Sequence, residues 1–345
     1  MCEDTMKLFQ RLLVAPAALG LMAPVAVNAD TFSSTTSLGG SAFFTLGSVE
    51  NGTGDTNEEL YMQYAYGLDM TSSFTGEDAL YIGMEAGNAG TGPLSSMDSA
   101  ENTSSNAVTV QSAYYTFPLG DIAVLAGPLV DQDDVVGATT SKYSDTFRLG
   151  SMPFSLAGAE TGPGVGLTYA TDNGFVLSGS FVADDGDSSS KGINADTGND
   201  VTTVTLGYNS TNGWGGGIIV ASNDGDVTTD SKGYDTFGIG GYYTPESIPA
   251  TLSIAYDSKD PETGDDETDI FVGVDYEVGP GTLHLAWNSS EEDDGNDKTN
   301  SDGFEIAYSY AINDSVTITP GFFTVEETTS TDEDSGVVVE TAFKF

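Results

Sequence analysis

Apolar and polar residues alternate along this chain with a period of two. In "LYMQYAYGLDM", every second residue from Leu60 to Met70 is apolar or aromatic, while Gln63 and Asp69 fall on the opposite face. Similar alternation is found in segments 80–85, 270–277, 282–288, 304–310 and 337–345. Successive side chains of a strand point to opposite faces, so each segment predicts a strand with one apolar and one polar face.

Sixteen candidate strands follow from this pattern. They start near residues 35, 58, 78, 105, 121, 163, 174, 200, 213, 233, 249, 268, 280, 302, 314 and 335. Short connections such as "PLGD", "TDNG", "STNG" and "EVGPG" carry the Gly, Pro, Asn and Asp residues of tight turns. They alternate with longer connections such as "SKDPETGDDETD" and "SSEEDDGNDKTNSDG", which hold most of the acidic residues.

A transmembrane barrel accounts for this alternation in connection length. One rim of such a barrel faces the periplasm with short turns, and the other faces outward with long loops. A soluble β-sandwich has no reason for such regularity, and an even strand number places both termini on the periplasmic side. The sequence therefore predicts an all-β fold: a transmembrane antiparallel β-barrel of about 16 strands with short periplasmic turns and long acidic external loops.

Aromatic residues supply an independent indication. A girdle of aromatic side chains is expected where a barrel meets the bilayer interface. The candidates at the periplasmic ends of the strands are Tyr64, Tyr66, Tyr114, Phe117, Tyr208, Trp214, Tyr243, Tyr276, Tyr308, Tyr310, Phe343 and Phe345. The general preference of aromatic residues for strands explains their presence but not their recurrence at one end. We therefore expect the last strand to bury its apolar face against lipid.

The first residues indicate export. Lys7 and Arg11 precede an apolar run that ends at about Val27, and small residues follow. Pro16 and Pro24 interrupt this run, which is shorter than a spanning helix requires. The pattern predicts a signal peptide at 1–29 that is removed on export. The barrel is then expected at 30–345, with its constriction loop at about 129–162.

The connection at about 129–162 differs from the other long ones. It contains hydrophobic residues and two of the nine basic residues of the chain. A loop with its own apolar residues packs rather than extending into solvent, so we expect this third external loop to fold inward and narrow the pore. An extracellular lid or a subunit-contact latch is the alternative. The residues expected at the constriction are Asp131, Asp133, Asp134, Lys142, Asp145 and Arg148.

Charge indicates the preferred solute. The chain has 53 acidic and 9 basic residues and a formal net charge of −44, which excludes nucleic acid as a partner. Carboxylates on the polar faces of strands are expected to line a water-filled lumen, attract cations and oppose anions, an effect that weakens with salt. The residues expected to line the lumen are Asp69, Glu85, Asp257, Asp275 and Glu305, together with Glu340.

The sequence gives little support for an enzyme. His284 is the only histidine, which we take to exclude a histidine-based metal cluster or catalytic triad. "DDGD" and "NDGD" lack the spaced ligand set of a calcium loop, and "GWGGGIIV" lacks the strand–helix context of a dinucleotide site. Cys2 is the only cysteine and precedes the expected cleavage site, so no disulfide forms. We expect no catalytic residue, cofactor or metal.

Several stretches carry a family likeness. The leader "MKLFQRLLVAPAALGLMAPVAVNA", the opening "FSSTTSLGGSAFFTLG", the middle "GPGVGLTYATDNGFVLSGSFVA" and the final Phe345 together resemble cyanobacterial outer-membrane porins. These are the Som-type proteins, which are grouped with OprB-like carbohydrate-selective porins and are also called iron-uptake porins. The resemblance implies passive diffusion of small hydrophilic solutes or inorganic ions, and a terminal phenylalanine read by the barrel-assembly machinery.

The chain departs from that family in one respect. Its members usually carry an S-layer-homology domain and a coiled coil between leader and barrel, which tether them to peptidoglycan. Here "VNAD" runs directly into the first expected strand, so a tether of this kind is not expected. A homotrimer would have to form through the barrel wall.

These observations predict an outer-membrane porin that prefers cations. A carbohydrate-selective channel is the alternative within transport, and it would need aromatic residues along the lumen, for which Tyr61, Tyr81 and Phe271 are candidates. The alternative from another class is a non-conducting surface barrel or adhesin whose acidic loops bind divalent cations or a partner. Bilayer conductance separates these hypotheses.

Overall fold

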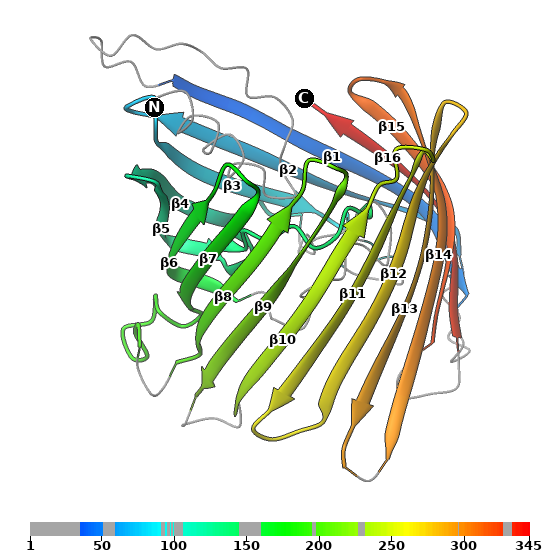
Figure 1. Cartoon of the computed structure of the whole chain (residues 1–345). Coiled ribbons are helices and arrows are strands. Elements are labelled where there is room, and N and C mark those ends of the chain that lie inside the picture. Colours follow the sequence, from blue (N-terminus) through cyan, green and yellow to red (C-terminus); the bar gives the residue numbers. More distant parts are fainter. Residues whose placement is uncertain are drawn as a thin grey trace.

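The chain folds into one closed antiparallel barrel, which Figure 1 shows with its strands tilted across the view. The computed structural model describes residues 35–50, 59–90, 94, 97, 99, 106–144, 160–194, 198–226, 232–295, 297–326 and 333–345. The strands are β1 (Thr35–Glu50), β2 (Tyr61–Ser73), β3 (Ala79–Gly87), β4 (Thr109–Leu119), β5 (Ile122–Asp131), β6 (Thr161–Ala170), β7 (Phe175–Ala183), β8 (Asp200–Asn209), β9 (Trp214–Gly225), β10 (Lys232–Tyr243), β11 (Ala250–Pro261), β12 (Asp266–Val278), β13 (Gly281–Asp293), β14 (Lys298–Asn313), β15 (Val316–Glu326) and β16 (Glu333–Lys344).

The predicted fold class is confirmed. Each strand pairs with its neighbours in sequence, and every observed start lies within four residues of the predicted one. β1 and β16 close the ring in a continuous antiparallel register from Ser41↔Lys344 to Glu50↔Ser335. Closure leaves no strand edge unpaired, which a barrel in lipid requires because no water is available there to satisfy the backbone.

Two acidic connections are shorter than predicted. β11 and β12 are joined by residues 262–265, and β13 and β14 by residues 294–297, so most of the residues assigned to these loops belong to strands. Figure 1 shows both connections at the lower end of the long strands. Ladder hydrogen bonds form irrespective of side-chain polarity, and Lys298 offsets part of the repulsion by pairing with Glu291 at 2.5 Å and Asp293 at 3.2 Å.

The two faces of the barrel wall have opposite polarity. Large apolar side chains on the outer face are exposed, including Leu177, Leu206 and Ile254 at 49%, 45% and 55%. Polar side chains on the inner face are buried, as Thr203 and Ser253 illustrate. This reverses the arrangement of a soluble β protein and is the arrangement expected when lipid covers the outside of a barrel with a polar interior.

The aromatic girdle is present at the rim with the short turns. Phe175 packs on Tyr208 and Tyr208 on Trp214, with ring centroids 4.7 and 5.0 Å apart. Three predicted members were placed wrongly: Tyr64 and Tyr66 are the fourth and sixth of the thirteen residues of β2, away from its end at the short-turn rim, and the Tyr114 hydroxyl donates to Asp134 on the inside. The pattern of alternation did not show where β2 ends. Tyr115 and Phe117, stacked at 5.7 Å, provide the outward aromatic pair of β4 instead.

Glycine shapes the short turns. Gly174 between β6 and β7 has a φ of 97°, and Gly213 between β8 and β9 has a φ of 78°. L side chains rarely adopt this conformation, so these positions favour glycine. The predicted turns "TDNG" and "STNG" end at these two residues.

The predicted signal peptide at 1–29 lies outside the described residues. In the part of the chain that the structure describes, no helix is long and apolar enough to cross a membrane.

Candidate functional site: the lumen and its inward loop

A segment of the β5–β6 connection, residues 132–144, runs along the inner wall; we call it the inward loop. It begins with a short 3-10 helix, Gln132–Val135. Asp131 caps this turn by accepting a hydrogen bond from the Asp133 N–H at 3.0 Å, and the Asp134 carboxylate accepts one from the Asp131 N–H at 3.2 Å. The capping box turns the chain away from β5 at a defined angle.

Hydrogen bonds attach the inward loop to strands far around the ring. The Gln132 amide donates to Thr203 of β8 at 2.5 Å, and the Gly137 N–H donates to Ser178 of β7 at 3.0 Å. Further along, the Lys142 N–H donates to Ser253 of β11 at 3.0 Å. The polar inner face of the wall therefore supplies partners for the backbone of a loop that would otherwise lack them.

Tyr143 joins the inward loop to β12, β13 and β14. Its side chain is 4% exposed, and its hydroxyl donates to the carboxylate of Glu305 on β14 at 2.5 Å. Its ring lies 5.4 Å from Phe271 and 6.3 Å, edge-on, from His284. Apolar packing and a hydrogen bond to a carboxylate thus both hold Tyr143, near the end of the inward loop, against the barrel wall.

Glycines on the inner wall make room for the inward loop. A Cβ at Gly273 would lie 2.6 Å from the ring of Tyr143, and one at Gly217 would lie 2.6 Å from the Cβ of Ala138. Both distances are shorter than side-chain carbons tolerate, so the loop occupies space that larger residues would fill. The expectation that this connection packs against the barrel is thus met within residues 132–144.

Five of the predicted acidic residues gather where the inward loop begins. The Tyr81 hydroxyl donates to Asp69 at 2.5 Å, and the Tyr81 ring lies 5.0 Å from that of Tyr114. Tyr114 in turn donates to Asp134 at 3.1 Å. Glu85 lies within electrostatic reach of Asp69 and Asp131. We call this set the acidic patch; its members are Asp69, Glu85, Asp131, Asp133 and Asp134.

Enclosure by the barrel wall and neighbouring negative charges raise the pKa of two carboxyl groups of the acidic patch. Enclosure by the wall, together with the charges of Asp131 and Asp134, raises the pKa of Asp133 to about 7. Enclosure and the charge of Asp131 also raise the pKa of Asp134 to about 6, although two donated hydrogen bonds act in the opposite direction. Asp133 is exposed, so water in the lumen reaches its side chain.

The predicted basic residues are separated from the acidic patch or lie outside the described part. The Lys142 ammonium lies 4.3 Å from the ring centroid of Tyr242 on β10, and its N–H bonds to β11. In a ring of sixteen strands, β11 stands opposite β3, so Lys142 lies across the barrel from Glu85. Asp145 and Arg148 lie outside the described residues.

Of the other four residues expected to line the lumen, Asp257, Glu305 and Glu340 are buried within the barrel, whereas Asp275 is partly exposed. Asp257 and Glu305 are 2% and 0% exposed, and Glu305 accepts the hydrogen bond of Tyr143. Asp275 accepts from the imidazole of His284 at 2.7 Å. A period-two pattern gives the face of a residue but not what covers it, so the prediction that Asp257, Glu305 and Glu340 contact the lumen water is corrected by their burial.

His284 takes part in a chain of hydrogen bonds across β12 to β15. Its Nδ1 lies 2.7 Å from Asp275, its Nε2 lies 2.9 Å from the Ser309 hydroxyl, and Ser309 lies 3.0 Å from Thr319. A single histidine was expected to exclude a triad-like geometry, and that reasoning was wrong, because one imidazole between a carboxylate and a hydroxyl suffices. This series of hydrogen bonds links four neighbouring strands beside Tyr143, whose ring packs against His284.

A second connection also packs inside the barrel, which was not predicted. Leu94, between β3 and β4, is 0% exposed and receives a hydrogen bond on its carbonyl from Gln63 at 2.9 Å. Ser99 of the same connection donates to Glu340 on β16. An apolar cluster surrounds Leu94: Val49, Ala65, Ala89, Met97, Ala307, Phe323 and Val338.

A signal for this second segment was available in the sequence. Leu94 and Met97 are apolar residues within an otherwise polar connection, "AGTGPLSSMDSAENTSSN". Apolar residues within a polar connection, which predict the inward packing of the β5–β6 connection, are therefore also present between β3 and β4. Taken together, the two segments contact β1, β2 and β7 to β16, and the acidic patch lies on β2, β3 and β5 and at the start of the inward loop.

Comparison with known proteins identifies the family. Residues 15–333 match the protein family described as Gram-negative porin. Similar solved structures include the trimer form of in-vitro folded OmpT of Vibrio cholerae, at 11% identity, covering 91% of this chain and 100% of that chain with a TM-score of 0.62. The search of curated proteins found no match.

Two further structures show the same architecture. An anion-selective porin from Comamonas acidovorans is 12% identical, with coverage of 91% and 100% and a TM-score of 0.62. The outer membrane channel DcaP of Acinetobacter baumannii is 14% identical, with coverage of 93% and 100% and a TM-score of 0.63. At such identities these likenesses concern the fold. The family match, which spans most of the chain, together with the closed sixteen-stranded barrel, shows that the chain belongs to the Gram-negative porin family of outer-membrane channels for passive diffusion.

Proposed function

We propose that this porin passes small hydrophilic solutes and inorganic ions with a preference for cations. The observation that carries the proposal is the acidic patch, in which five carboxylates gather on one side of the lumen at the start of the inward loop. Carboxylates that line a water-filled pore raise the local concentration of cations and oppose anions. The fold does not decide this preference, since one similar barrel is anion-selective.

The constriction is proposed to lie between the acidic patch and the parts of the inward loop that line the opposite wall. Lys142 lies beside β10 and β11, on the side of the ring opposite the patch, so the acidic and basic groups stand on different sides of the lumen. We assign Asp131, Asp133 and Asp134 to the cation-attracting side. Asp69 and Glu85 extend that side along the wall.

Conductance tests this function. Purified protein in a planar bilayer is expected to give ohmic single channels, and the reversal potential in a KCl gradient is expected to have the sign of K⁺ preference. Absence of channels would support a non-conducting surface barrel or adhesin instead. Channels that prefer Cl⁻ would contradict the role of the acidic patch while leaving the porin function in place.

Ion preference should also depend on pH. With a pKa of about 7 for Asp133 and about 6 for Asp134, both carboxyl groups are charged at pH 8 and neutral at pH 5. We therefore expect the K⁺ preference to fall as the pH decreases through 7 and 6, well above the range of ordinary carboxyl groups at about 4. Reversal potentials measured at half-unit steps from pH 8 to 4 locate the midpoint, and a midpoint near 4 would contradict this assignment.

The carbohydrate-selective alternative loses two of its three candidate residues. Phe271 is 1% exposed beneath Tyr143, and the Tyr61 hydroxyl oxygen accepts a hydrogen bond from the Leu94 N–H at 2.6 Å. Both rings are therefore engaged with segments inside the barrel. Tyr81 packs against Tyr114 within the acidic patch. The observed contacts give more support to ion preference than to a sugar track.

The finer placement of this chain also belongs to the proposal. Its leader-like segment and the stretches that resemble Som-type proteins support an exported porin of the cyanobacterial Som type, with the barrel-assembly machinery as a partner. Lipid would contact the apolar outer face. A homotrimer through the barrel wall is proposed by analogy with the trimer form of OmpT.

A further inference from the structure

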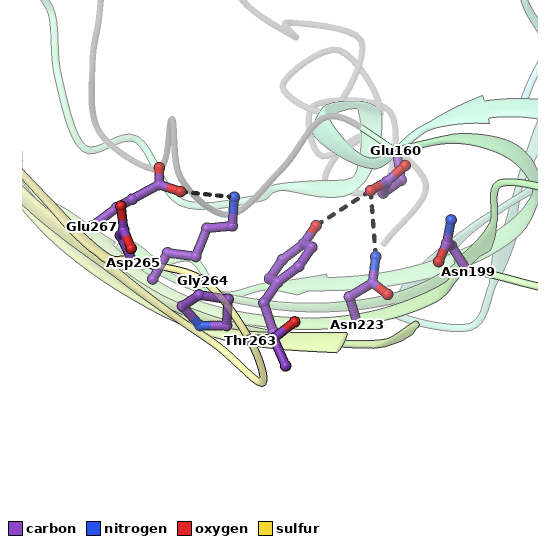
Figure 2. A pocket seen from close by; sticks show the side chains of 10 residues that line it. Glu160, Asn199, Asn223, Thr263, Gly264, Asp265 and Glu267 are labelled. Atoms are coloured by element: carbon purple, nitrogen blue, oxygen red, sulfur yellow. Dashed lines mark hydrogen bonds and ion pairs between the residues drawn. The ribbon is translucent and has the colours of Figure 1, made fainter. Parts of the chain in front are cut away.

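A pocket of about 300 Å³ lies on the inner wall at the rim opposite the short turns (Figure 2). The strands β9, β10, β11 and β12 form its floor near that rim, and Glu160, which directly precedes β6, completes it. Its volume corresponds to roughly ten water molecules and to the lower end of small-molecule sites. The pocket adjoins the acidic patch on the Glu160 side, because the Gln132 N–H donates to the Glu160 carbonyl at 3.0 Å and Asp131 lies within electrostatic reach of Glu160.

The lining of the pocket contains hydrogen-bonding groups and an excess of negative charge. Three carboxylates, on Glu160, Asp265 and Glu267, accompany one ammonium group, on Lys259. Asn199, Asn223 and Tyr234 add amide groups and a phenol. The excess of two negative charges over the lining favours a cation over a neutral molecule of the same size and opposes an anion.

Glu160 is the carboxylate best placed to meet a ligand. It accepts a hydrogen bond from the Asn223 amide and another from the Tyr234 hydroxyl, both at 3.3 Å, as Figure 2 shows by its dashed lines. Both of these partners are neutral, and both distances are long for their type. The two contacts orient the carboxylate without neutralising its charge.

Lys259 shows that the pocket can hold an ammonium group. Its Nζ lies 3.4 Å from the carboxylate of Glu267 and 5.0 Å from the ring centroid of Tyr234. A carboxylate and an aromatic face are the groups that attract organic cations. Because Lys259 has a flexible side chain and a long ion pair, a soluble ammonium compound can compete with it for the same surroundings.

The size of the pocket argues against a bare metal ion. A metal site needs several oxygen ligands converging within about 2.6 Å of one point. Within the described part of the chain, no group of three or more histidine, cysteine or acidic side chains has an arrangement that could hold a metal ion. A polar organic molecule, by contrast, can use the carboxylates, amides and phenol at once.

We propose that this pocket binds a small hydrophilic organic cation of about the size of a hexose, such as an amino sugar, at the mouth of the barrel. Glu160 holds the ammonium group, and Asn199 and Asn223 hydrogen-bond to the hydroxyl groups. Binding itself is independent of conduction; only the further passage of the bound solute through the lumen rests on the proposed porin function.

Three probes of equal ring size but different charge test the proposal. Glucosamine, glucose and glucuronate are titrated calorimetrically into the full-length protein in neutral detergent at low salt. Glucosamine is expected to bind about tenfold more tightly than glucose, because its ammonium group adds one charge-assisted hydrogen bond. Glucuronate is expected to bind most weakly, because its negative charge is repelled by the lining. Equal affinities for glucosamine and glucose, tighter binding of glucuronate, or no binding of glucosamine would each overturn the proposal.

Variants locate the binding. Glu160→Gln keeps the shape of the side chain and should reduce the affinity for glucosamine about tenfold while leaving that for glucose nearly unchanged. Lys259→Gln removes the competing ammonium and should strengthen glucosamine binding. Asp172→Asn, an equal change of charge in the exposed β6–β7 turn, is the control and should have no effect.

The outcomes remain distinguishable from those of the proposed function. Resistance of the folded barrel to SDS at room temperature confirms that each variant is folded, and Glu267→Gln provides a second charge deletion if Glu160→Gln fails this check. Channels that conduct without any binding of glucosamine would overturn only this inference. Glucosamine binding by a protein that forms no channels would overturn only the porin function. Unchanged affinity in both carboxylate variants would show that the cation binds elsewhere, and the inference would fail.

Discussion

Replacing Asp131, Asp133 and Asp134 together by asparagine is expected to remove most of the K⁺ preference of the channel. Asparagine keeps the size of the side chain, and the change deletes three negative charges from the acidic patch. A unit charge 4 Å from an ion contributes about 1 kcal/mol in water, a factor of roughly five in local ion concentration. The cation-to-anion permeability ratio, obtained from reversal potentials in a KCl gradient, should therefore fall by at least about fivefold.

A matched control separates a local effect from one of total charge. Asp121, Asp172 and Asp314 are exposed residues of three short turns, and their joint replacement by asparagine deletes the same number of charges at the far rim. This variant should keep a permeability ratio close to that of the unchanged protein. The difference should shrink as salt is raised, because the Debye length falls from about 10 Å at 0.1 M to 3 Å at 1 M. Equal losses in the two triple variants would refute the acidic patch as the selective element.

Truncating Tyr143 to alanine is expected to widen the channel and weaken the barrel at the same time. The substitution removes a ring that packs against Phe271 and His284 and the hydroxyl that donates to Glu305. Loss of a buried aromatic side chain costs about 3–5 kcal/mol. Single-channel conductance should rise because the end of the inward loop is released, and the temperature at which the barrel loses its resistance to SDS should fall.

Tyr143→Phe serves as the matched variant. It preserves the ring packing and deletes only the hydrogen bond to Glu305, which is worth about 2 kcal/mol when the acceptor is charged. Its conductance should remain near that of the unchanged protein, with a smaller loss of thermal stability. If Tyr143→Ala is destabilised but conducts as before, the inward loop does not limit the pore and the constriction lies elsewhere.

The strands could be predicted from the sequence because the alternation of apolar and polar residues is a local pattern. A strand between lipid and a polar lumen must alternate along its own length, whatever its neighbours are, and β12 shows this in "IFVGVDYE". The same reasoning gave the inward direction of Asp257, Asp275 and Glu305. It could not give what lies above them, because Tyr143 reaches Glu305 across 162 residues of sequence.

Connections were harder to predict than strands for a physical reason. The acidic stretches around residues 262–265 and 294–297 have the composition of solvated loops, yet most of their residues continue the ladder of β11 to β14. Backbone pairing stabilises them even though their side chains are polar and partly of like charge. Composition therefore indicated exposure to solvent correctly and secondary structure incorrectly.

The candidate site contains one feature that can be predicted from neighbouring residues and others that depend on contacts between distant parts of the chain. Asp131, Asp133 and Asp134 are adjacent in sequence, so their mutual repulsion could be anticipated from the chain alone. Their association with Asp69 and Glu85 depends on the order of β2, β3 and β5 around the ring, and the segment that contains Leu94 depends on a pocket formed by β1, β2 and β14 to β16. The reason for glycine at positions such as Gly217 and Gly273 can be seen only in the folded structure, where the inward loop occupies the space of a side chain.

The sequence by itself determined the barrel, its strand number and the polarity of its two faces, because alternation and turn chemistry act between residues close together in the chain. Only the tertiary structure decided which carboxylates meet water in the lumen, which are covered by Tyr143, and which surround the pocket beside Glu160. Those outcomes depend on closure of β1 onto β16 and on two connections folding inside, which bring together residues that no local pattern relates.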